Sequence, residues 1–174
     1  MTRAAVATII ARNYLPQARV LGDSLRRFHP DVPLSVLIID DDGSLESIGI
    51  ADPKRFRKGR TVKQIATAIK PRLMQHLTRD FASVLFIDPD SLVTGDLSPL
   101  FRALEQHSVL LTPHLLAPPQ TADRIERELN IGQSGIYNGG LVGVSNSDEG
   151  LRFLAWWRDR TEECCREDVA AGAY

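Results

Sequence analysis

The stretch SVLFIDPD, residues 83–90, joins a nearly continuous apolar run to two aspartates that flank a proline. An apolar run of this length, rich in large and β-branched side chains, predicts a buried strand at residues 83–87. In open α/β sheets, ligands bind in the crevice outside the carboxyl ends of the strands. The sequence therefore predicts that Asp88 and Asp90 lie at the ligand-binding edge of a sheet.

The segments on either side of this stretch alternate in character. Apolar runs predict four further strands, at residues 4–10, 34–39, 109–111 and 141–144. Amphipathic or capped segments predict helices at residues 17–28, 61–69, 71–78, 98–106 and 122–129, and from 148 to about 167, with Ser98 and Ser147 as caps. Residues 44–58 are polar and contain Gly49 and Pro53, which predicts a loop with one short turn of helix. The alternation predicts an α/β sandwich around a mostly parallel sheet.

The bulk composition narrows the class of protein. The chain has 174 residues, which fits one domain with an adequate hydrophobic core. Its formal charge is −1, from 21 basic against 22 acidic residues, and this balance argues against a partner that is a nucleic acid. No apolar run reaches the roughly 20 residues of a membrane span. With only the adjacent Cys164 and Cys165, expected as reduced thiols, the composition predicts a cytoplasmic protein.

The two aspartates have the spacing of metal ligands. In an extended chain, residues i and i+2 point to the same side, so that Asp88 and Asp90 can face one ion. Pro89 fixes its own φ and favours an extended Asp88. Paired carboxylates repel unless a cation or a proton joins them, and oxygen ligands suit Mg²⁺ or Mn²⁺. The alternative interpretation is a surface turn in which each aspartate caps backbone N–H groups.

A second acidic cluster follows the strand predicted at residues 34–39. Asp40, Asp41 and Asp42 precede Gly43 there. An aspartate at such a strand end can accept a hydrogen bond from the base or the ribose of a nucleotide, and Asp40 is closest to the strand. The alternative interpretation is a solvated turn.

Several short motifs, taken in order, resemble a known family. They are ARNYLP at residues 11–16 with ARVL at 18–21, ATAIKP at 66–71, LFIDPD at 85–90, LTPH at 111–114, GIYNGG at 135–140 and FLAWW at 153–157. In this order and spacing they look like the N-terminal part of bacterial nucleotide-sugar glycosyltransferases of the GT-A fold, close to the glycogenin and galactosyltransferase-like group. The resemblance implies a Rossmann-like, three-layer sandwich over nearly the whole chain.

The resemblance also implies a role for particular residues. Asp88 and Asp90 would match the family's DxD motif and hold both Mn²⁺ or Mg²⁺ and the donor diphosphate, with Pro89 between them. The other donor-site residues that it implies are Ala11, Arg12 and Asn13 against the nucleoside, Lys70 near the phosphate or sugar, and Asn138, Gly139 and Gly140 beside the sugar. His114 is interpreted as a loop residue. The predicted partners are a nucleotide-sugar donor, with UDP favoured, and a glycan, lipid or protein acceptor.

The chain departs from the family in two respects. Related enzymes continue into acceptor-side loops and a later histidine that ligates the metal, so residues 1–174 are interpreted as a nucleotide-sugar-binding domain without the acceptor-side segment. The stretch between Asp42 and Pro53 is short where a further strand would be expected. The alternatives are a binding domain without turnover and another α/β phosphotransfer enzyme. The GxxxxGK[ST] motif is absent, and residues 4–14 contain no aspartate for a phosphatase nucleophile.

Overall fold

The protein folds around one five-stranded sheet with the strand order β2-β1-β3-β5-β4. The computed structural model describes residues 4–165. The strands are β1 (Ala4–Ile10), β2 (Leu34–Ile38), β3 (Ser83–Ile87), β4 (Val109–Pro113) and β5 (Tyr137–Ser145). β1 pairs in parallel with β2 and β3, whereas β5 runs antiparallel to β3 and β4. The prediction of a mostly parallel sheet is confirmed, and β3 is its central strand.

Helices cover both faces of the sheet, so the predicted three-layer sandwich is also confirmed. Successive strand residues point to opposite faces. On one face, Val6 and Leu85 pack with α1 (Leu15–Phe28) and α5 (Ser98–Gln106). On the other face, Phe86 packs with α4 (Val62–Leu77) and α7 (Asp148–Cys164). Burial of one large apolar side chain contributes about 2 kcal/mol, so these two cores fix the helices to the sheet.

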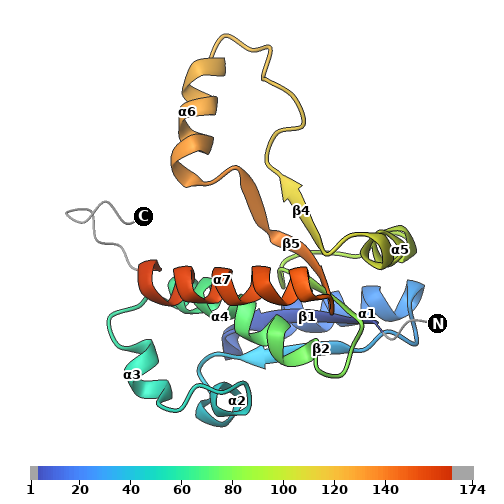
Figure 1. Ribbon diagram of the computed structural model, residues 1–174, viewed down its shortest axis with the longest axis vertical. Coiled ribbons are helices and arrows are strands. Elements are labelled where there is room, and N and C mark those ends of the chain that lie inside the picture. The colour runs from blue at the N-terminus through green and yellow to red at the C-terminus, as the bar shows by residue number, and fades with distance from the viewer. Residues whose placement is uncertain (1–3, 166–174) are drawn as a thin grey trace.

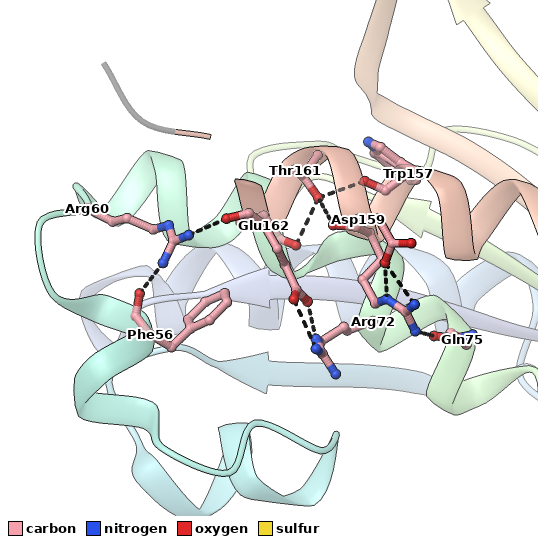
Figure 2. A network of polar contacts seen from close by, with 10 residues as sticks. Phe56, Arg60, Arg72, Gln75, Trp157, Asp159, Thr161 and Glu162 are labelled. Atoms are coloured by element: carbon pink, nitrogen blue, oxygen red, sulfur yellow. Dashed lines mark hydrogen bonds and ion pairs between the residues drawn. The ribbon is translucent and has the colours of Figure 1, made fainter. Parts of the chain in front are cut away.

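Polar contacts join α7 to α4 on their shared face (Figure 2). Arg72 of α4 donates two hydrogen bonds to the carboxylate of Glu162, one of them with an Nη2–Oε2 distance of 3.0 Å. Arg60, just before α4, donates to the backbone carbonyl of Glu162 at 2.6 Å. The hydroxyl of Thr161 donates to the carbonyl of Ala68 at 3.2 Å. Together these contacts fix the position of the helix that carries Lys70.

Residues 44–58 differ from the prediction of a loop with a single turn. They contain most of α2 (Asp42–Ser47) and all of α3 (Pro53–Arg57), and α2 lies where the family would place a further strand. Both helices begin at an aspartate N-cap: the carboxylates of Asp41 and Asp52 accept the amides of Ser44 and Arg55, each at 2.9 Å. Hydrogen bonds from the hydroxyl and the amide of Ser44 lower the pKa of Asp41. These caps stabilise α2 and α3, which are too short to show the apolar periodicity that marks a helix in a sequence.

The prediction of separate helices at residues 61–69 and 71–78 was wrong, because α4 is one helix with Pro71 inside it. It begins with a capping box in which Thr61 and Gln64 exchange side-chain and backbone hydrogen bonds at 2.7 and 3.3 Å. Ile69 and Leu73, on either side of Pro71, are buried. We infer that this burial offsets the hydrogen bond that a proline removes from a helix interior.

Several element boundaries also differ from prediction: α1 begins at Leu15 rather than residue 17, β2 ends at Ile38 rather than residue 39, and β4 ends at Pro113 rather than residue 111. β5 begins at Tyr137 rather than residue 141, because its first residues pair with Thr112 and Pro113 of β4 beyond an irregularity in the register. The polar helix predicted at residues 122–129 is α6 (Arg124–Ser134), and the N-cap of α5 is Leu97 rather than Ser98. Ser147 caps α7 as predicted. In Figure 1, α6 and the adjoining ends of β4 and β5 project from the body of the molecule.

Candidate functional site

The DPD sequence forms a turn at the end of the central strand. The amide of Asp88 donates to the carbonyl of Gly140 at 2.8 Å, which extends the pairing of β3 with β5 by one residue. The amide of Ser91 then donates back to the carbonyl of Asp88 at 3.1 Å and closes the turn. Asp88 is half-buried, and Asp90 is exposed. The buried strand therefore presents both carboxylates at the carboxyl edge of the sheet, as the sequence predicts, but the segment that carries them is a turn and not the extended chain that the sequence predicts.

Lys70 reaches this turn from α4, and its side chain is only 10% exposed. Its Nζ atom lies 3.0 Å from Oδ1 of Asp88 and 2.9 Å from the carbonyl oxygen of Gly139. The same atom lies 4.4 Å from the centre of the Phe86 ring. A buried ammonium group is stable only when it is paired and hydrogen-bonded. Lys70 therefore links α4, the aspartate turn and the beginning of β5 in one arrangement.

The first residues of β5 complete the arrangement from the opposite direction. The side-chain oxygen of Asn138 accepts the amide of Gly140 at 2.6 Å. A Cβ atom at Gly140 would lie 2.8 Å from Oδ1 of Asn138 and 2.9 Å from Oδ2 of Asp88. A Cβ atom at Gly139 would meet Nζ of Lys70 at an ordinary 3.6 Å. Glycine at position 140 therefore allows the strand to approach the Asp88 carboxylate closely.

One hollow, here called the helix-side hollow, lies between the aspartate turn, β1 and α4. Its volume is about 520 Å³, which is within the range of ligand-binding pockets. Its walls combine apolar groups with two lysines; the lining residues are Ile9, Ile10, Ala11, Tyr14, Ile39, Val62, Lys63, Ala66, Thr67, Lys70, Phe86, Asp88, Pro89 and Asp90. Two aspartates, Asp88 and Asp90, face the two lysines in this wall, so the hollow suits a ligand with a flat apolar part and charged or polar groups.

A second hollow, here called the loop-side hollow, lies on the other side of the same two aspartates. Its volume is about 670 Å³. It is lined by the end of β3, the loop that follows, and parts of β4 and β5; the residues are Ile87, Asp88, Asp90, Ser91, Leu92, Val93, Thr94, Gly95, Asp96, Leu97, Thr112, Asn138, Gly140 and Leu141. Asp88 and Asp90 are thus shared by both hollows.

The structure brings most of the predicted site residues together. Ala11, Lys70, Asp88, Pro89 and Asp90 line the helix-side hollow, while Asn138 and Gly140 line the loop-side hollow and Gly139 contacts Lys70. Arg12, Asn13 and Asp40 line neither hollow.

The carboxylate of Asp40 instead accepts the amide of Arg12 at 3.1 and 3.2 Å. Asp40 thereby supplies the hydrogen-bond acceptor for the first backbone amide of the 3-10 helix η1 (Arg12–Tyr14). The N-cap residue of this helix makes no side-chain hydrogen bond. Arg12 also pairs with Asp41, at 3.5 Å. These contacts give Asp40 a structural role, and its contact with a nucleotide stays a prediction.

Several residues that line the helix-side and loop-side hollows are not among those predicted from the sequence. Lys63 and Thr67 precede Lys70 by seven and three positions on α4 and share its hollow. That spacing places all three on one helix face, so it was a usable signal. Tyr14 is 42% exposed and also lines this hollow. The loop of residues 91–97 shows neither the helical nor the strand periodicity that would have marked it in the sequence.

The aspartate pair offers oxygen ligands of the kind that Mg²⁺ and Mn²⁺ prefer. Only Oδ1 of Asp88 is occupied by Lys70, and across residues 4–165 neither Oδ2 of Asp88 nor the Asp90 carboxylate accepts a hydrogen bond. Within the same residues, no group of three or more His, Cys, Asp or Glu side chains is placed to hold one metal ion. His114 contacts the carbonyl of Gly135 at 3.0 Å through Nδ1, as a loop residue would. The residues therefore fit a cation held by two carboxylates and completed by ligand oxygens.

Solved structures of similar architecture identify the fold. The galactosyltransferase LgtC, in complex with donor and acceptor sugar analogs, aligns with 91% of this chain at a TM-score of 0.55 and 15% identity. The glycosyltransferase GlyE of Streptococcus pneumoniae TIGR4 aligns with 94% of it, at a TM-score of 0.55 and 19% identity. The chain has the GT-A fold. Its GT-A domain corresponds to 65% of the LgtC chain and 39% of the GlyE chain.

Sequence comparison adds one curated relative. Uncharacterized protein YfnF of Bacillus subtilis (strain 168) is 25% identical over 192 aligned positions, which cover 98% of this GT-A chain. The chain spans 62% of the length of that relative. No protein-family model matches the chain. Over the described residues, no helix is long and apolar enough to cross a membrane.

Proposed function

We propose that this GT-A domain binds a nucleoside-diphosphate sugar, with UDP as the favoured nucleotide, and transfers the sugar to an acceptor with the assistance of Mn²⁺ or Mg²⁺. The observation that carries the proposal is the position of Asp88 and Asp90, which stand at the end of the central strand and border both hollows. A site for sugar transfer needs two substrates on either side of one reacting centre. The two hollows meet at these carboxylates.

The helix-side hollow suits the donor. Its apolar wall includes Ala11 and Ile39, against which a base can pack, and Tyr14 offers an aromatic face. Lys63 and Lys70 supply positive charge for the diphosphate. The metal ion, when bound by the aspartates, supplies charge neutralisation for the departing nucleoside diphosphate. We assign the nucleoside to this hollow and the diphosphate to its edge at Asp88.

The transfer is a substitution at the anomeric carbon of the donor sugar. An acceptor hydroxyl oxygen bonds to that carbon while its bond to the diphosphate oxygen breaks, and the electron pair leaves with the nucleoside diphosphate. The acceptor's proton is released to solvent. Lys70 holds Asp88 against Gly139 and so fixes the reacting edge before substrates arrive. A site that is fixed in this way stabilises charge without a reorganisation cost.

Calorimetric titration tests the donor site directly. UDP, GDP and dTDP are each titrated with and without Mn²⁺, and we expect Mn²⁺ to tighten the binding of at least one nucleotide. Asp90→Ala removes an exposed carboxylate that has no hydrogen-bonding partner among residues 4–165, and we expect it to abolish the tightening, a loss of roughly tenfold or more in affinity. Asp80→Ala is the control. It changes an exposed aspartate that follows the C-terminal end of α4 and lines neither hollow, so it should leave the tightening by Mn²⁺ intact. Equal behaviour of the two variants would contradict the proposed role of Asp90.

Gly140→Ala should disturb the site more than the fold. The added methyl group would meet the flexible ends of Asn138 and Asp88, at 2.8 and 2.9 Å, so these side chains must turn away. We expect UDP affinity in Mn²⁺ to fall by about tenfold, with a loss of only about 1 kcal/mol in the free energy of unfolding. Gly139→Ala places a methyl group at an ordinary 3.6 Å from Lys70 and should cost less affinity. Calorimetry and thermal unfolding of both variants check the difference.

The second candidate function is binding of a nucleotide sugar without turnover. It is favoured by the metal site, because residues 4–165 contain two suitable carboxylates but no set of three ligands. NMR spectroscopy of a UDP-sugar mixed with the protein and Mg²⁺ separates the two functions. Slow release of free sugar indicates a working donor site, while an intact donor in the presence of tight binding indicates a binding domain.

A further inference from the structure

A third hollow, here called the arginine hollow, lies beside the start of β3, at the end of that strand remote from the aspartate turn. Its volume is about 430 Å³, and residues of α7, of the C-terminal end of α4 and of the segment after α2 line it. Asn146, one of these residues, donates its backbone amide to the carbonyl of Ala82, just before β3, at 2.8 Å. The arginine hollow shares no lining residue with the two hollows that border Asp88 and Asp90. It is therefore a separate site.

The ionisable side chains that line this hollow are all basic, and no aspartate or glutamate lines it among the described residues. They are Arg72, His76, Arg79 and Arg158. Two of the arginines form ion pairs, Arg72 with Glu162 and Arg158 with Asp159, and neither of these carboxylates lines the hollow. Arg79 is exposed, and its side chain makes no hydrogen bond or ion pair within residues 4–165. The hollow therefore carries one guanidinium charge that no contact neutralises.

The paired side chains retain hydrogen-bond donors that no residue uses. Arg72 bonds Glu162 through Nε and Nη2 (Figure 2), and its Nη1 makes no hydrogen bond within residues 4–165. A Cβ atom at Gly49, which lines the hollow, would lie 3.9 Å from this Nη1. Gln75 accepts a hydrogen bond from Arg158 at 3.2 Å through its side-chain oxygen, so its NH₂ group remains a donor. N–H donors without an acceptor therefore line the hollow from α4 and from the turn after it.

The C-terminal end of α4 does not account for these basic groups. Basic side chains often bond the last carbonyls of a helix. Here other donors fill that role: the carbonyl of Gln75 accepts the hydroxyl of Thr78 at 3.0 Å. The carbonyl of His76 accepts the backbone amide of Arg79 at 3.3 Å. The imidazole of His76 and the guanidinium of Arg79 are therefore not used to cap the helix.

We propose that the arginine hollow binds the phosphate group of a small phosphorylated compound. Guanidinium groups match phosphate oxygens with two parallel hydrogen bonds, and the three terminal oxygens of a phosphate monoester can accept from Arg72, His76 and Arg79 in different directions. The volume exceeds that of a phosphate group and lies in the range of small-molecule pockets. Ile48 and Leu151 offer apolar surface to the remainder of the compound. The proposal does not depend on the sugar-transfer reaction.

Arg79→Gln tests the proposal without removing a contact that the fold uses. Arg19→Gln is the matched control, because Arg19 of α1 is also exposed, makes no side-chain contact within residues 4–165 and does not line the arginine hollow. Lys63→Met is the second control, because the lysines of the helix-side hollow also attract phosphate. Thermal unfolding without phosphate first establishes that all three variants fold.

Inorganic phosphate, glucose 6-phosphate and glucose are then titrated into the isotope-labelled protein at constant ionic strength, and NMR follows the backbone amides. We expect the two phosphates, but not glucose, to cause saturable shifts at Gly49 and Asn146. The affinity read from these signals should fall about tenfold in Arg79→Gln and stay unchanged in both controls. No saturation below about 10 mM of either phosphate, equal affinities in Arg79→Gln and Arg19→Gln, an equal loss in Lys63→Met, or shifts confined to the helix-side hollow would overturn the proposal.

Discussion

Lys70→Met is expected to lower the rate of UDP-sugar hydrolysis, at saturating donor and Mg²⁺, by about 100-fold, the usual effect of removing one preorganised charge from a reacting centre. The ammonium group of Lys70 contacts Asp88 and Gly139 at once, and its side chain is 10% exposed. Methionine keeps the length and the apolar part of the side chain. It removes the charge that orients Asp88 and the donor that satisfies the Gly139 carbonyl. Release of free sugar, followed by NMR, measures the rate.

The same substitution should have a smaller effect on stability. Breaking a fully buried ion pair costs about 3–5 kcal/mol, but water can solvate Asp88, whose side chain is 39% exposed. We therefore expect a loss of about 2 kcal/mol in the free energy of unfolding, measured with urea. Lys63→Met is the matched control, because Lys63 lines the same hollow but is exposed and contacts no carboxylate within residues 4–165. Comparable losses of rate in both variants would show that Lys70 acts only through the general charge of the hollow.

Gly150→Ala is expected to be the most destabilising glycine-to-alanine substitution within residues 4–165. A Cβ atom at Gly150 would lie 2.2 Å from the backbone oxygen of Ser145 and 3.2 Å from that of Ser108. Neither oxygen belongs to a flexible side chain, so the first turn of α7 must move away from the ends of β5 and β4. We expect a loss of about 3 kcal/mol, seen as a fall of roughly 10 °C in the midpoint of thermal unfolding.

Gly132→Ala provides the control for this variant. Gly132 also lies within a helix, α6, but a Cβ atom there meets nothing within 4 Å. Alanine favours a helix over glycine by about 0.5–1 kcal/mol, so the control should leave the midpoint unchanged or raise it slightly. A fall of similar size in both variants would mean that the contact at Ser145 is not the cause.

The sequence predicted best the elements whose burial is complete. β1 and β3 have the predicted bounds because most of their residues are packed on both faces and therefore form continuous apolar runs. β5 was predicted only from residue 141 because its first three residues are exposed and include a glycine, and only pairing with β4 makes them a strand. The helices α2 and α3 depend on aspartate caps rather than on an apolar face. Local hydrogen bonds therefore decided the boundaries that periodicity missed.

The residues of the site also divide into those that the neighbouring sequence predicts and those that depend on distant contacts. The placement of Asp88 and Asp90 followed from the end of a buried strand, a property that a few neighbouring residues determine. Lys70 was implied only by the family resemblance, because its contacts with Asp88 and Gly139 span 18 and 69 positions of the sequence. The loop-side hollow could not be predicted, since its loop is held by Ser24 and His29 of a distant helix and its end. Such contacts exist only after the layers have assembled.

Pro71 has one further consequence for the wall of the helix-side hollow. A proline has no backbone N–H, so the carbonyl of Thr67, four residues earlier in α4, does not receive the intrahelical hydrogen bond that another residue would donate. Thr67 lines that hollow. The covalent structure of one imino acid therefore leaves one carbonyl oxygen of α4 outside the helix ladder, in the turn that carries both Thr67 and Lys70 toward the hollow.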